Sequence, residues 1–178
     1  MDYNKILEGC LKGNLKAQRE LYECFASKML GVCLRYCSNR EDAKDIMHDG
    51  FIKVFTKLDT FSGSGPLEAW MRRIFVNKAL EQLRKNDVLR ETVDYDGATN
   101  NIEADVDIVS DITRDELMQI INSMPPGYRT VFNLFAIEGY SHHEIADLLH
   151  ISEGTSKSQY ARAKYWLQTK INSKYSEQ

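Results

Sequence analysis

Apolar side chains recur every three or four residues along the first part of the chain, which is the spacing of one buried helix face. The recurring positions begin at Ile6 and, after a short break, run again from Leu21 to Tyr36. This pattern predicts two helices folded into a hairpin.

Two further helices are expected in the same half. One begins at Asn39, a residue type that caps helix N-termini, and continues to about Leu58. The other follows a loop rich in Gly and Ser at 60–66 and runs to about Asn86, with Pro66 expected as its first residue.

The helical period stops at 88–113, where acidic residues and turn-forming Gly and Asn predict a flexible linker. It resumes at Thr113, whose spacing from Glu116 fits a capping box, and again at Ser141, which has the same relation to Glu144. The expected fold is therefore all-α. Two small helical domains at 1–87 and 114–178 are joined by the acidic linker at 88–113, and the C-terminal domain is a helix-turn-helix.

The net charge of −3 is unevenly distributed. Residues 88–113 hold one basic and seven acidic groups, whereas 1–87 hold 15 basic and 12 acidic groups and 114–178 hold seven of each. All the excess acid lies in the linker. The average charge therefore does not exclude a nucleic-acid partner for either helical domain.

The segment from 141 to 171 has the form of a helix-turn-helix, because a short capped helix and a three-residue turn precede a long helix. Residues 154–175 contain five basic side chains and no acid, which suits contact with DNA phosphates. A solvated terminal helix is the alternative. The residues expected to be exposed for reading duplex DNA are Ser152, Glu153, Thr155, Lys157, Ser158, Gln159 and Arg162.

The loop and helix from 60 to 90 combine basic side chains with interleaved aromatic residues. Cations for the backbone, an adaptable loop and aromatic rings for unstacked bases are typical of single-strand binding. Phe75 shares a stripe with Met71 and is expected in the core instead. The candidate residues are Phe61, Ser62, Gly63, Ser64, Trp70, Arg73, Asn77, Lys78, Arg84 and Lys85.

A third candidate surface is acidic. Asp42, Asp45, His48 and Asp49 recur about one turn apart on the exposed side of the helix that begins at Asn39. Helical period alone leaves two interpretations open, a solvated face or a docking surface for a partner protein.

Other functional classes find little support. The chain has no GxGxxG, Walker, HExxH or GxSxG motif, and its histidines are poorly placed as co-ligands, so we expect no catalytic site, no metal and no cofactor. The four cysteines follow the apolar pattern and are expected in the core. No apolar run approaches the ~20 residues of a membrane span and no signal peptide is present, so a cytoplasmic protein is expected.

Three segments, in this order, resemble bacterial RNA polymerase sigma factors of the extracytoplasmic-function (ECF) group of the sigma-70 family. They are EDAKDIMHDGF at 41–51, FSGSGPLEAWMRRIFVN at 61–77 with LRK at 83–85, and GYSHHEIADLL at 139–149 followed by ISEGTSKS at 151–158 and RAK at 162–164. The resemblance covers nearly the whole chain and implies a promoter-specificity subunit.

The resemblance implies a partner for each surface. The loop at 61–66 and the helix after it would capture a flipped base and bind the melted minus-ten element, and the helix at 153–168 would read the minus-thirty-five element. The linker would thread toward the polymerase active-site cleft, the flap of the second-largest subunit would be a further contact, and an anti-sigma factor is an expected partner. The residues that would dock on the clamp coiled coil of the largest subunit are Asp42, Asp45, His48, Asp49, Phe51 and Ile52.

The sequence departs from the family pattern at His48, where Gln is common, and at Ser62, where a basic residue is common. It departs again at Ser156, where a β-branched apolar residue is common, and at Gln159, where Arg is common. We therefore expect polymerase docking to be retained and promoter reading to be weak, with an additional factor recruiting the protein. Two alternatives stay open: a helix-turn-helix regulator with an N-terminal sensing or dimerisation domain, and a polymerase-binding interaction protein.

Overall fold

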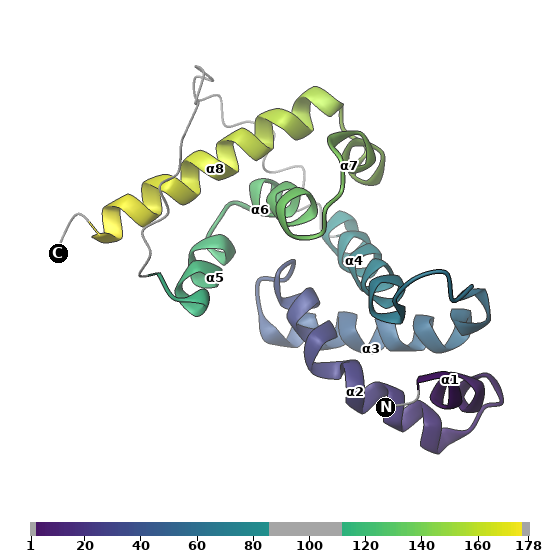
Figure 1. Ribbon diagram of the computed structural model, residues 1–178. Coiled ribbons are helices and arrows are strands. Elements are labelled where there is room, and N and C mark those ends of the chain that lie inside the picture. Colours follow the sequence, from purple (N-terminus) through teal and green to yellow (C-terminus); the bar gives the residue numbers. More distant parts are fainter. Residues whose placement is uncertain (1–2, 86–111, 176–178) are drawn as a thin grey trace. The chain divides into compact units, whose positions relative to one another are not determined.

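The computed structural model describes residues 3–85 and 112–175, and throughout these ranges the chain forms helices and connecting turns without a β-strand (Figure 1). Contacts within the chain divide it into two compact units, Met1–Lys85 and Asn86–Gln178. The all-α fold class is confirmed. The predicted linker at 88–113 lies outside the described residues except for its last two positions.

The N-terminal unit is built around α2, which packs against three other helices. Helix α3 also packs along α4 (Figure 1). The core between them contains large side chains that are almost completely buried, among them Leu21, Met29 and Phe75. The helices are α1 (Tyr3–Leu11), α2 (Leu15–Leu34), α3 (Arg40–Lys57), a short 3-10 turn (Leu58–Thr60) and α4 (Leu67–Lys85).

Local signals start the two functional helices of this unit. The side chain of Asn39 accepts a hydrogen bond from the backbone N–H of Asp42 at 2.8 Å, so the predicted cap of α3 is confirmed. Helix α4 begins at Leu67 rather than at Pro66. The carbonyl of Pro66 accepts from the N–H groups of Ala69 and Trp70 at 3.0 and 3.3 Å, which places Pro66 just before the first helical residue.

Helices α3 and α4 approach closely at Gly50. A Cβ atom added at Gly50 would lie 2.6 Å from Cδ1 of Phe75, a ring with no exposed surface. The Phe75 ring meets Phe51 edge to face, with ring centroids 5.1 Å apart. Any side chain at position 50 would therefore push the two helices apart.

We expect Gly50→Ala to lower the free energy of unfolding by about 1–3 kcal/mol, the usual cost of overpacking a core. Urea unfolding followed by Trp70 fluorescence in a Trp166→Phe background would report on the N-terminal unit alone. Gly31→Ala is the matched control, because a Cβ there meets no atom within 4 Å. That change should stabilise α2 by up to about 1 kcal/mol. Equal effects of the two substitutions would contradict the close approach.

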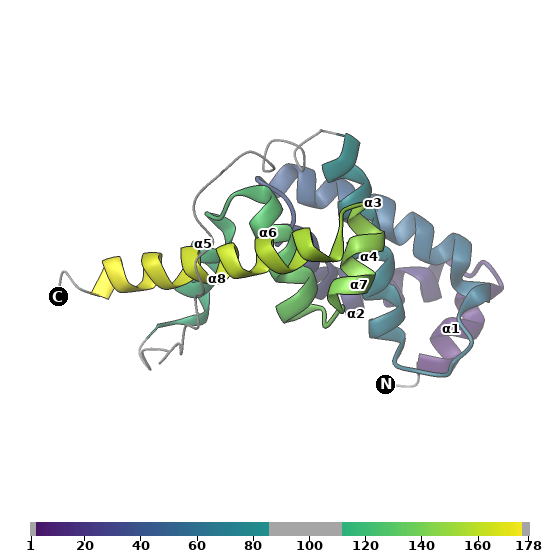
Figure 2. The same cartoon turned by 90° about the horizontal axis from the view of Figure 1, so that it is seen from above.

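The C-terminal unit is organised by α8, which runs along the unit and contacts α5, α6 and α7 (Figure 2). Its core includes Ile121, Met124, Tyr128 and Ala163, with Trp166 packed against them. The helices are α5 (Arg114–Asn122), α6 (Pro126–Phe132), a π-helical turn (Asn133–Ile137), α7 (His142–Leu149) and α8 (Glu153–Tyr175).

Both predicted capping boxes of the C-terminal unit are confirmed. Thr113 pairs reciprocally with Glu116 at the start of α5, and Ser141 pairs with Glu144 at the start of α7. Glu116 also binds Lys174 at 2.7 Å, which links the start of α5 to the end of α8. The Lys174 ammonium and the Thr113 groups lower the pKa of Glu116 to about 2. This carboxylate therefore remains ionised well into acid.

The cysteines add to the helical core. Cys10 and Cys33 are buried, as predicted, whereas Cys24 and Cys37 are half-buried. Burial raises the pKa of the Cys33 thiol to about 12, so it remains protonated and unreactive at neutral pH. None of the described helices has both the length and the apolar character needed to span a membrane.

Candidate functional site

The first candidate surface is the solvent-facing side of α3. Asp42, Asp45, His48 and Asp49 are all exposed, together with Ile52, whose exposed fraction is 63%. Their separations of three and four residues place them on one helix face. We call these five residues the acidic face of α3. An exposed isoleucine among carboxylates gives this face both apolar and electrostatic character.

Phe51 does not belong to this face, so the expectation that its side chain contacts a partner is wrong. Only 3% of Phe51 is exposed, and its ring lies 4.6 Å from that of Tyr22, centroid to centroid. Together with the edge-to-face contact to Phe75, this packing holds α3 against α2 and α4. Phe51 therefore supports the acidic face from inside the unit.

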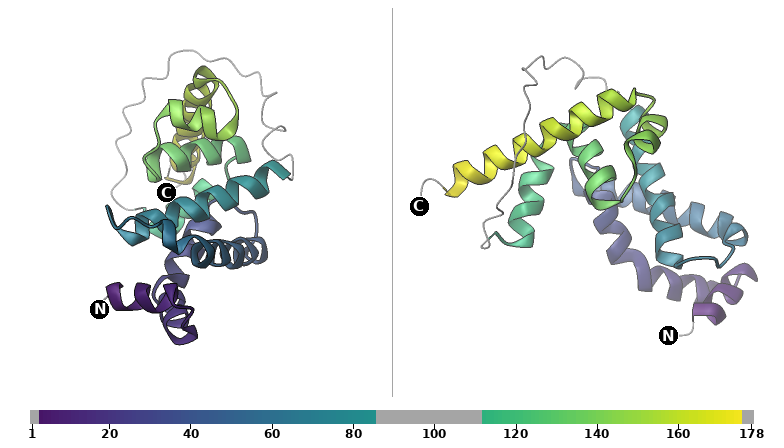
Figure 3. Two further views of the ribbon diagram at one scale, coloured as in Figure 1. Left: turned by 90° about the vertical axis from the view of Figure 1, so that its right-hand side faces the viewer. Right: turned by 45° about the horizontal axis from the view of Figure 1, so that its top comes forward.

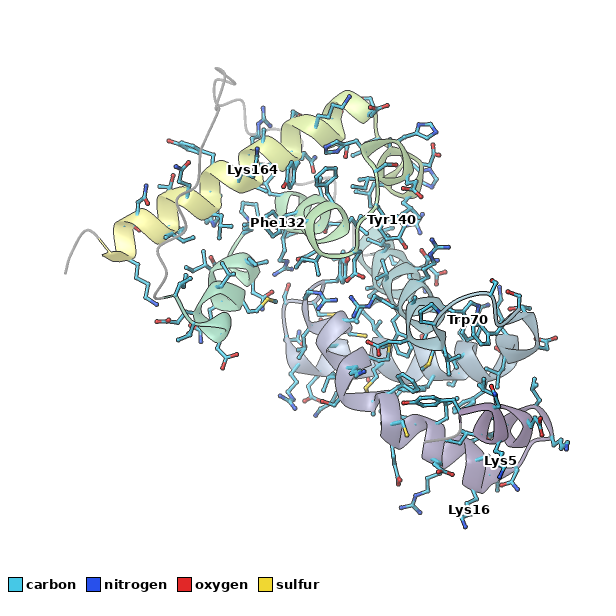
Figure 4. The ribbon with its side chains drawn as sticks, in the orientation of Figure 1. Lys5, Lys16, Trp70, Phe132, Tyr140 and Lys164 are labelled. Atoms are coloured by element: carbon cyan, nitrogen blue, oxygen red, sulfur yellow. The ribbon has the colours of Figure 1, made fainter. Side chains whose placement is uncertain are left out.

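The second candidate surface begins in the loop between α3 and α4. Trp70 lies on the first turns of α4 (Figure 4). The ring of Phe61 packs against it, with centroids 5.5 Å apart. The hydroxyl oxygens of Ser62 and Ser64 are 2.8 Å apart, and Gly63 has a φ of +73°. A side chain at position 63 would strain this turn, because L residues with a Cβ rarely adopt such an angle.

Helix α4 continues this surface with polar and basic groups. Trp70, Arg73 and Asn77 follow one another at three and four residues and so share one face. Arg84 and Lys85 lie near the end of the helix, and both are exposed. The loop at 61–66 and these five residues form what we call the aromatic-basic surface. It combines two packed rings with cations.

Lys78, also predicted for this surface, is more constrained. It forms an ion pair with Glu81 at 2.9 Å, which lowers the pKa of that carboxyl. Glu68, on the first turn of α4, binds Lys28 of α2 at 2.6 Å. This second ion pair fixes the start of α4, and therefore Trp70, against the rest of the unit.

The third candidate surface is the helix-turn-helix formed by α7 and α8, with α7 beside the first turns of α8 (Figure 3, right). His150 ends α7 in the left-handed conformation, with φ of 55°. Ser152 caps α8 by accepting from the N–H of Thr155 at 2.9 Å, and Glu153 binds Lys157 at 2.7 Å. Ser152, Glu153 and Lys157 are exposed.

Thr155, Ser158 and Arg162 are half-buried, and Gln159 is 7% exposed. The expectation that Gln159 is exposed to bases is therefore wrong. It follows Ser156 by three residues and precedes Ala163 by four, and both of these residues have no exposed surface. Gln159 thus lies on the face of α8 that packs against the rest of the unit.

A cluster between α7, α8 and the π-helical turn was not predicted. His142 stacks on Phe135, with centroids 4.3 Å apart and planes inclined by 15°, and meets Tyr160 edge to face. Its Nδ1 lies 2.9 Å from Oγ of the fully buried Ser156. A sequence signal existed, because a Ser at a buried helical position requires a hydrogen-bond partner. Helical period could not identify that partner.

Comparison with known families matches residues 21–88 to "Sigma-70 region 2" and residues 114–167 to "Sigma-70, region 4". One match lies on the helices that carry the acidic face and the aromatic-basic surface, and the other includes the helix-turn-helix. The chain belongs to the sigma-70 family of RNA polymerase sigma factors. It is a sigma factor that binds core RNA polymerase and promoter DNA and directs promoter-specific transcription.

Relatives place this sigma factor in the ECF group. It is 28% identical to the ECF RNA polymerase sigma-E factor of Haemophilus influenzae in an alignment 177 positions long that covers 93% of each chain. It is 26% identical to the ECF RNA polymerase sigma factor SigW of Bacillus subtilis, across 96% of this chain and 97% of SigW.

Solved structures share the fold of this sigma factor. RpoE of Bartonella quintana, in complex with the anti-sigma factor NepR, aligns with a TM-score of 0.52 at 24% identity, covering 87% of this chain and 96% of that one. CnrH, in complex with the cytosolic domain of CnrY, aligns with a TM-score of 0.50 at 20% identity, covering 94% and 96%.

Proposed function

We propose that each of the three surfaces of the sigma factor performs one step of transcription initiation. The acidic face of α3 docks on the clamp coiled coil of core polymerase. The aromatic-basic surface melts and holds the minus-ten element, and α8 reads the minus-thirty-five element as duplex. The observation that carries this assignment is the combination, in one small unit, of an exposed acidic-apolar helix face and a separate surface of packed aromatic rings and cations.

The acidic face suits a protein partner. Asp45 and Asp49 would repel DNA phosphates, whereas carboxylates around an apolar anchor complement a basic protein surface. Ile52 supplies the anchor, because burying an exposed isoleucine contributes up to about 1.5–3 kcal/mol. Three carboxylates on one face also favour rapid encounter with a basic partner.

The aromatic-basic surface suits a melted strand. Extruding a base from a duplex costs a few kcal/mol, which stacking on an aromatic ring and contacts to the backbone offset. The ring pair of Phe61 and Trp70 offers the stack, and Arg73 follows Trp70 by one turn to reach a phosphate. Lys78 contributes less, because Glu81 neutralises it locally.

Helix α8 suits duplex DNA. Its first turns expose Glu153 and Lys157 and present Thr155, Ser158 and Arg162 at the edge of the packed face, where side chains can reach base edges or phosphates. Gln159 takes no part in this reading because it is buried. With one predicted base-contacting residue fewer, α8 binds DNA less specifically, which supports the hypothesis that an additional factor recruits the sigma factor to promoters.

The partners extend beyond polymerase. The solved relatives RpoE and CnrH are bound to NepR and to the cytosolic domain of CnrY, and we propose that an anti-sigma factor likewise masks this chain. The flap of the second-largest subunit is the proposed contact of the C-terminal unit. The chain acts in the cytoplasm as a specificity subunit and contributes no catalytic step of its own.

The decisive experiment mixes the purified chain with core polymerase. A stable complex is expected by size-exclusion chromatography, together with initiation on a premelted template and only weak initiation on the promoters mapped from transcripts that overproduction induces. Failure to co-elute would refute the proposal. Co-elution without initiation would favour the polymerase-binding interaction protein, and DNA binding without polymerase would favour a helix-turn-helix regulator. Strong promoter-specific transcription with no added protein would refute the recruiting factor.

Arg162→Ala is expected to weaken binding of the holoenzyme to a mapped promoter by about 1–3 kcal/mol, since it removes one contact to a base or phosphate. Complex formation with core polymerase should not change. Fluorescence anisotropy with labelled promoter duplex measures the effect. Lys174→Ala is the matched control, because Lys174 lies near the far end of α8 and binds Glu116. If both variants lose the same affinity, the contact at Arg162 is general charge only.

A further inference from the structure

The first turn of α7 is joined to the first turn of α8 by one polar side-chain contact. Nδ1 of His142 lies 2.9 Å from Oγ of Ser156, whose side chain has no exposed surface. The imidazole stacks on Phe135 at 4.3 Å and meets Tyr160 edge to face at 5.8 Å. The ring is therefore held by the π-helical turn on one side and by α8 on the other.

This contact acts at the end of α8 that reads DNA. Ser156 directly follows Thr155 and precedes Ser158 by two residues, so a displacement of its backbone displaces both proposed readers. The apolar core around Ala163 and Trp166 holds the helix only two to three turns later. The rings of Phe132 and Phe135 also contact Tyr160, one turn after Ser156, so the His142 contact acts together with this aromatic packing in setting the angle of the first turns of α8.

We propose that His142 is a positioning residue for promoter reading: its hydrogen bond to Ser156 and its stack on Phe135 set the angle of α8 against α7. The inference rests on the proposed role of α8 in reading duplex DNA. His142 itself touches no DNA in this mechanism. It acts through Ser156 on the two residues that flank it.

The surroundings of His142 make this positioning dependent on pH. Burial and the nearby Lys157 ammonium lower the pKa of His142, and Glu153 opposes them. Lys157 and Glu153 are paired with each other, Tyr160 is the third titratable group of α8 that faces the ring, and the turn Asn133–Ile137 carries none. On α7 itself, His143 and Glu144 are the adjacent titratable groups, and Glu144 is engaged by Ser141.

The direction of the effect follows from linkage. Because the folded pKa of His142 lies below the unfolded value of about 6.5, the unfolded chain binds more protons on acidification. The contact between His142 and Ser156 is fully stable above about pH 6.5 and loses stability as the pH falls below that value. Specific promoter reading should therefore be constant above about pH 7 and decline as the pH falls below about 6.5, and the decline should depend on His142.

The test measures specificity rather than stability. The readout is the ratio of holoenzyme affinities for a mapped promoter and for the same duplex with a scrambled minus-thirty-five element, from about pH 6 to about pH 8. His142→Phe keeps an aromatic stack but leaves the Ser156 hydroxyl without its partner, and it should lower the ratio at neutral pH by roughly threefold to tenfold. His142→Asn offers a polar atom near the Nδ1 position and should restore most of the ratio, now without the pH dependence.

A matched control and a second variant complete the design. His143→Asn changes the neighbouring histidine, whose side chain is 78% exposed, and should reproduce the pH profile of the unchanged protein. Ser156→Ala removes the other partner and should lower the ratio even if His142→Phe folds poorly. Nitrogen chemical shifts of the imidazole, recorded in the full chain, should show that His142 stays neutral to lower pH than an imidazole with an unperturbed pKa.

Each outcome separates the inference from the proposed function. If the unchanged holoenzyme shows no preference for the intact minus-thirty-five element, reading by α8 fails and the positioning role fails with it. If the preference exists but His142→Phe and Ser156→Ala leave it intact, or if His142→Asn keeps the full pH dependence, only the positioning role is overturned. A loss of preference in His142→Phe with rescue by His142→Asn supports it.

Discussion

Asp45→Arg is expected to abolish the complex between the sigma factor and core RNA polymerase. Asp45 lies at the centre of the acidic face, flanked along the helix by Asp42 and Asp49, and it is exposed. Reversing its charge both removes an attraction and places a cation against a basic surface, and like charges in an interface cost several kcal/mol. A loss of at least about 3 kcal/mol corresponds to more than a hundredfold weaker binding.

Co-elution with core polymerase and competition against labelled wild-type protein would measure this effect. Glu8→Arg on α1 is the matched control, since it reverses an exposed carboxylate of the same unit away from α3. It should leave binding within about twofold, as expected for a change outside an interface. Circular dichroism of both variants should be unchanged, because neither position is buried. Normal binding of Asp45→Arg would refute docking through the acidic face.

Trp70→Ala is expected to reduce formation of the open promoter complex by roughly tenfold or more, because stacking of one base on an aromatic ring contributes about 1–3 kcal/mol. Binding to core polymerase should be unaffected, since Trp70 lies on a different helix from the acidic face. The rate of permanganate-detected melting on duplex promoter measures the effect. On a premelted template the deficit should shrink, because the cost of opening has been removed.

Two further variants test whether the effect depends on the aromatic ring of Trp70. Trp70→Phe should recover most of the rate, as a smaller ring can still pack on Phe61 and stack on a base. Tyr3→Ala deletes another exposed aromatic side chain of the same unit, 44% exposed, and should have no effect on melting. If Trp70→Ala reduces formation of the open complex as much on the premelted template as on duplex, Trp70 holds the melted strand and does not help to open it.

The sites could be predicted to different depths. The spacing of Asp42, Asp45 and Asp49 is enough to identify an exposed face, because α3 has one buried side and these three residues lie on the opposite side. The assignment of Phe51, two residues after Asp49, to the docking surface came from the family resemblance and not from this spacing. Its aromatic side chain lies at the junction of three helices, where the rings of Tyr22 and Phe75 enclose it.

Helix α8 shows the same division. Its start at residue 153 and its basic character follow from neighbouring residues, and the structure begins α8 at Glu153 as expected. The burial of Gln159 and the hydrogen bond between His142 and Ser156 do not, since they depend on how α8 lies against α7 and the π-helical turn. Polar residues at these positions are equally compatible with solvent and with a paired interior until that packing is known.

The helices, their N-caps, the division of charge and the family to which the chain belongs could all be predicted from the amino-acid sequence. These properties are local, because capping and helical period involve residues within four positions of one another. The tertiary structure alone decided which side chains of the three surfaces meet solvent, and it brought His142 to Ser156. Burial and pairing depend on contacts between helices that are distant in sequence, and no local pattern encodes these contacts.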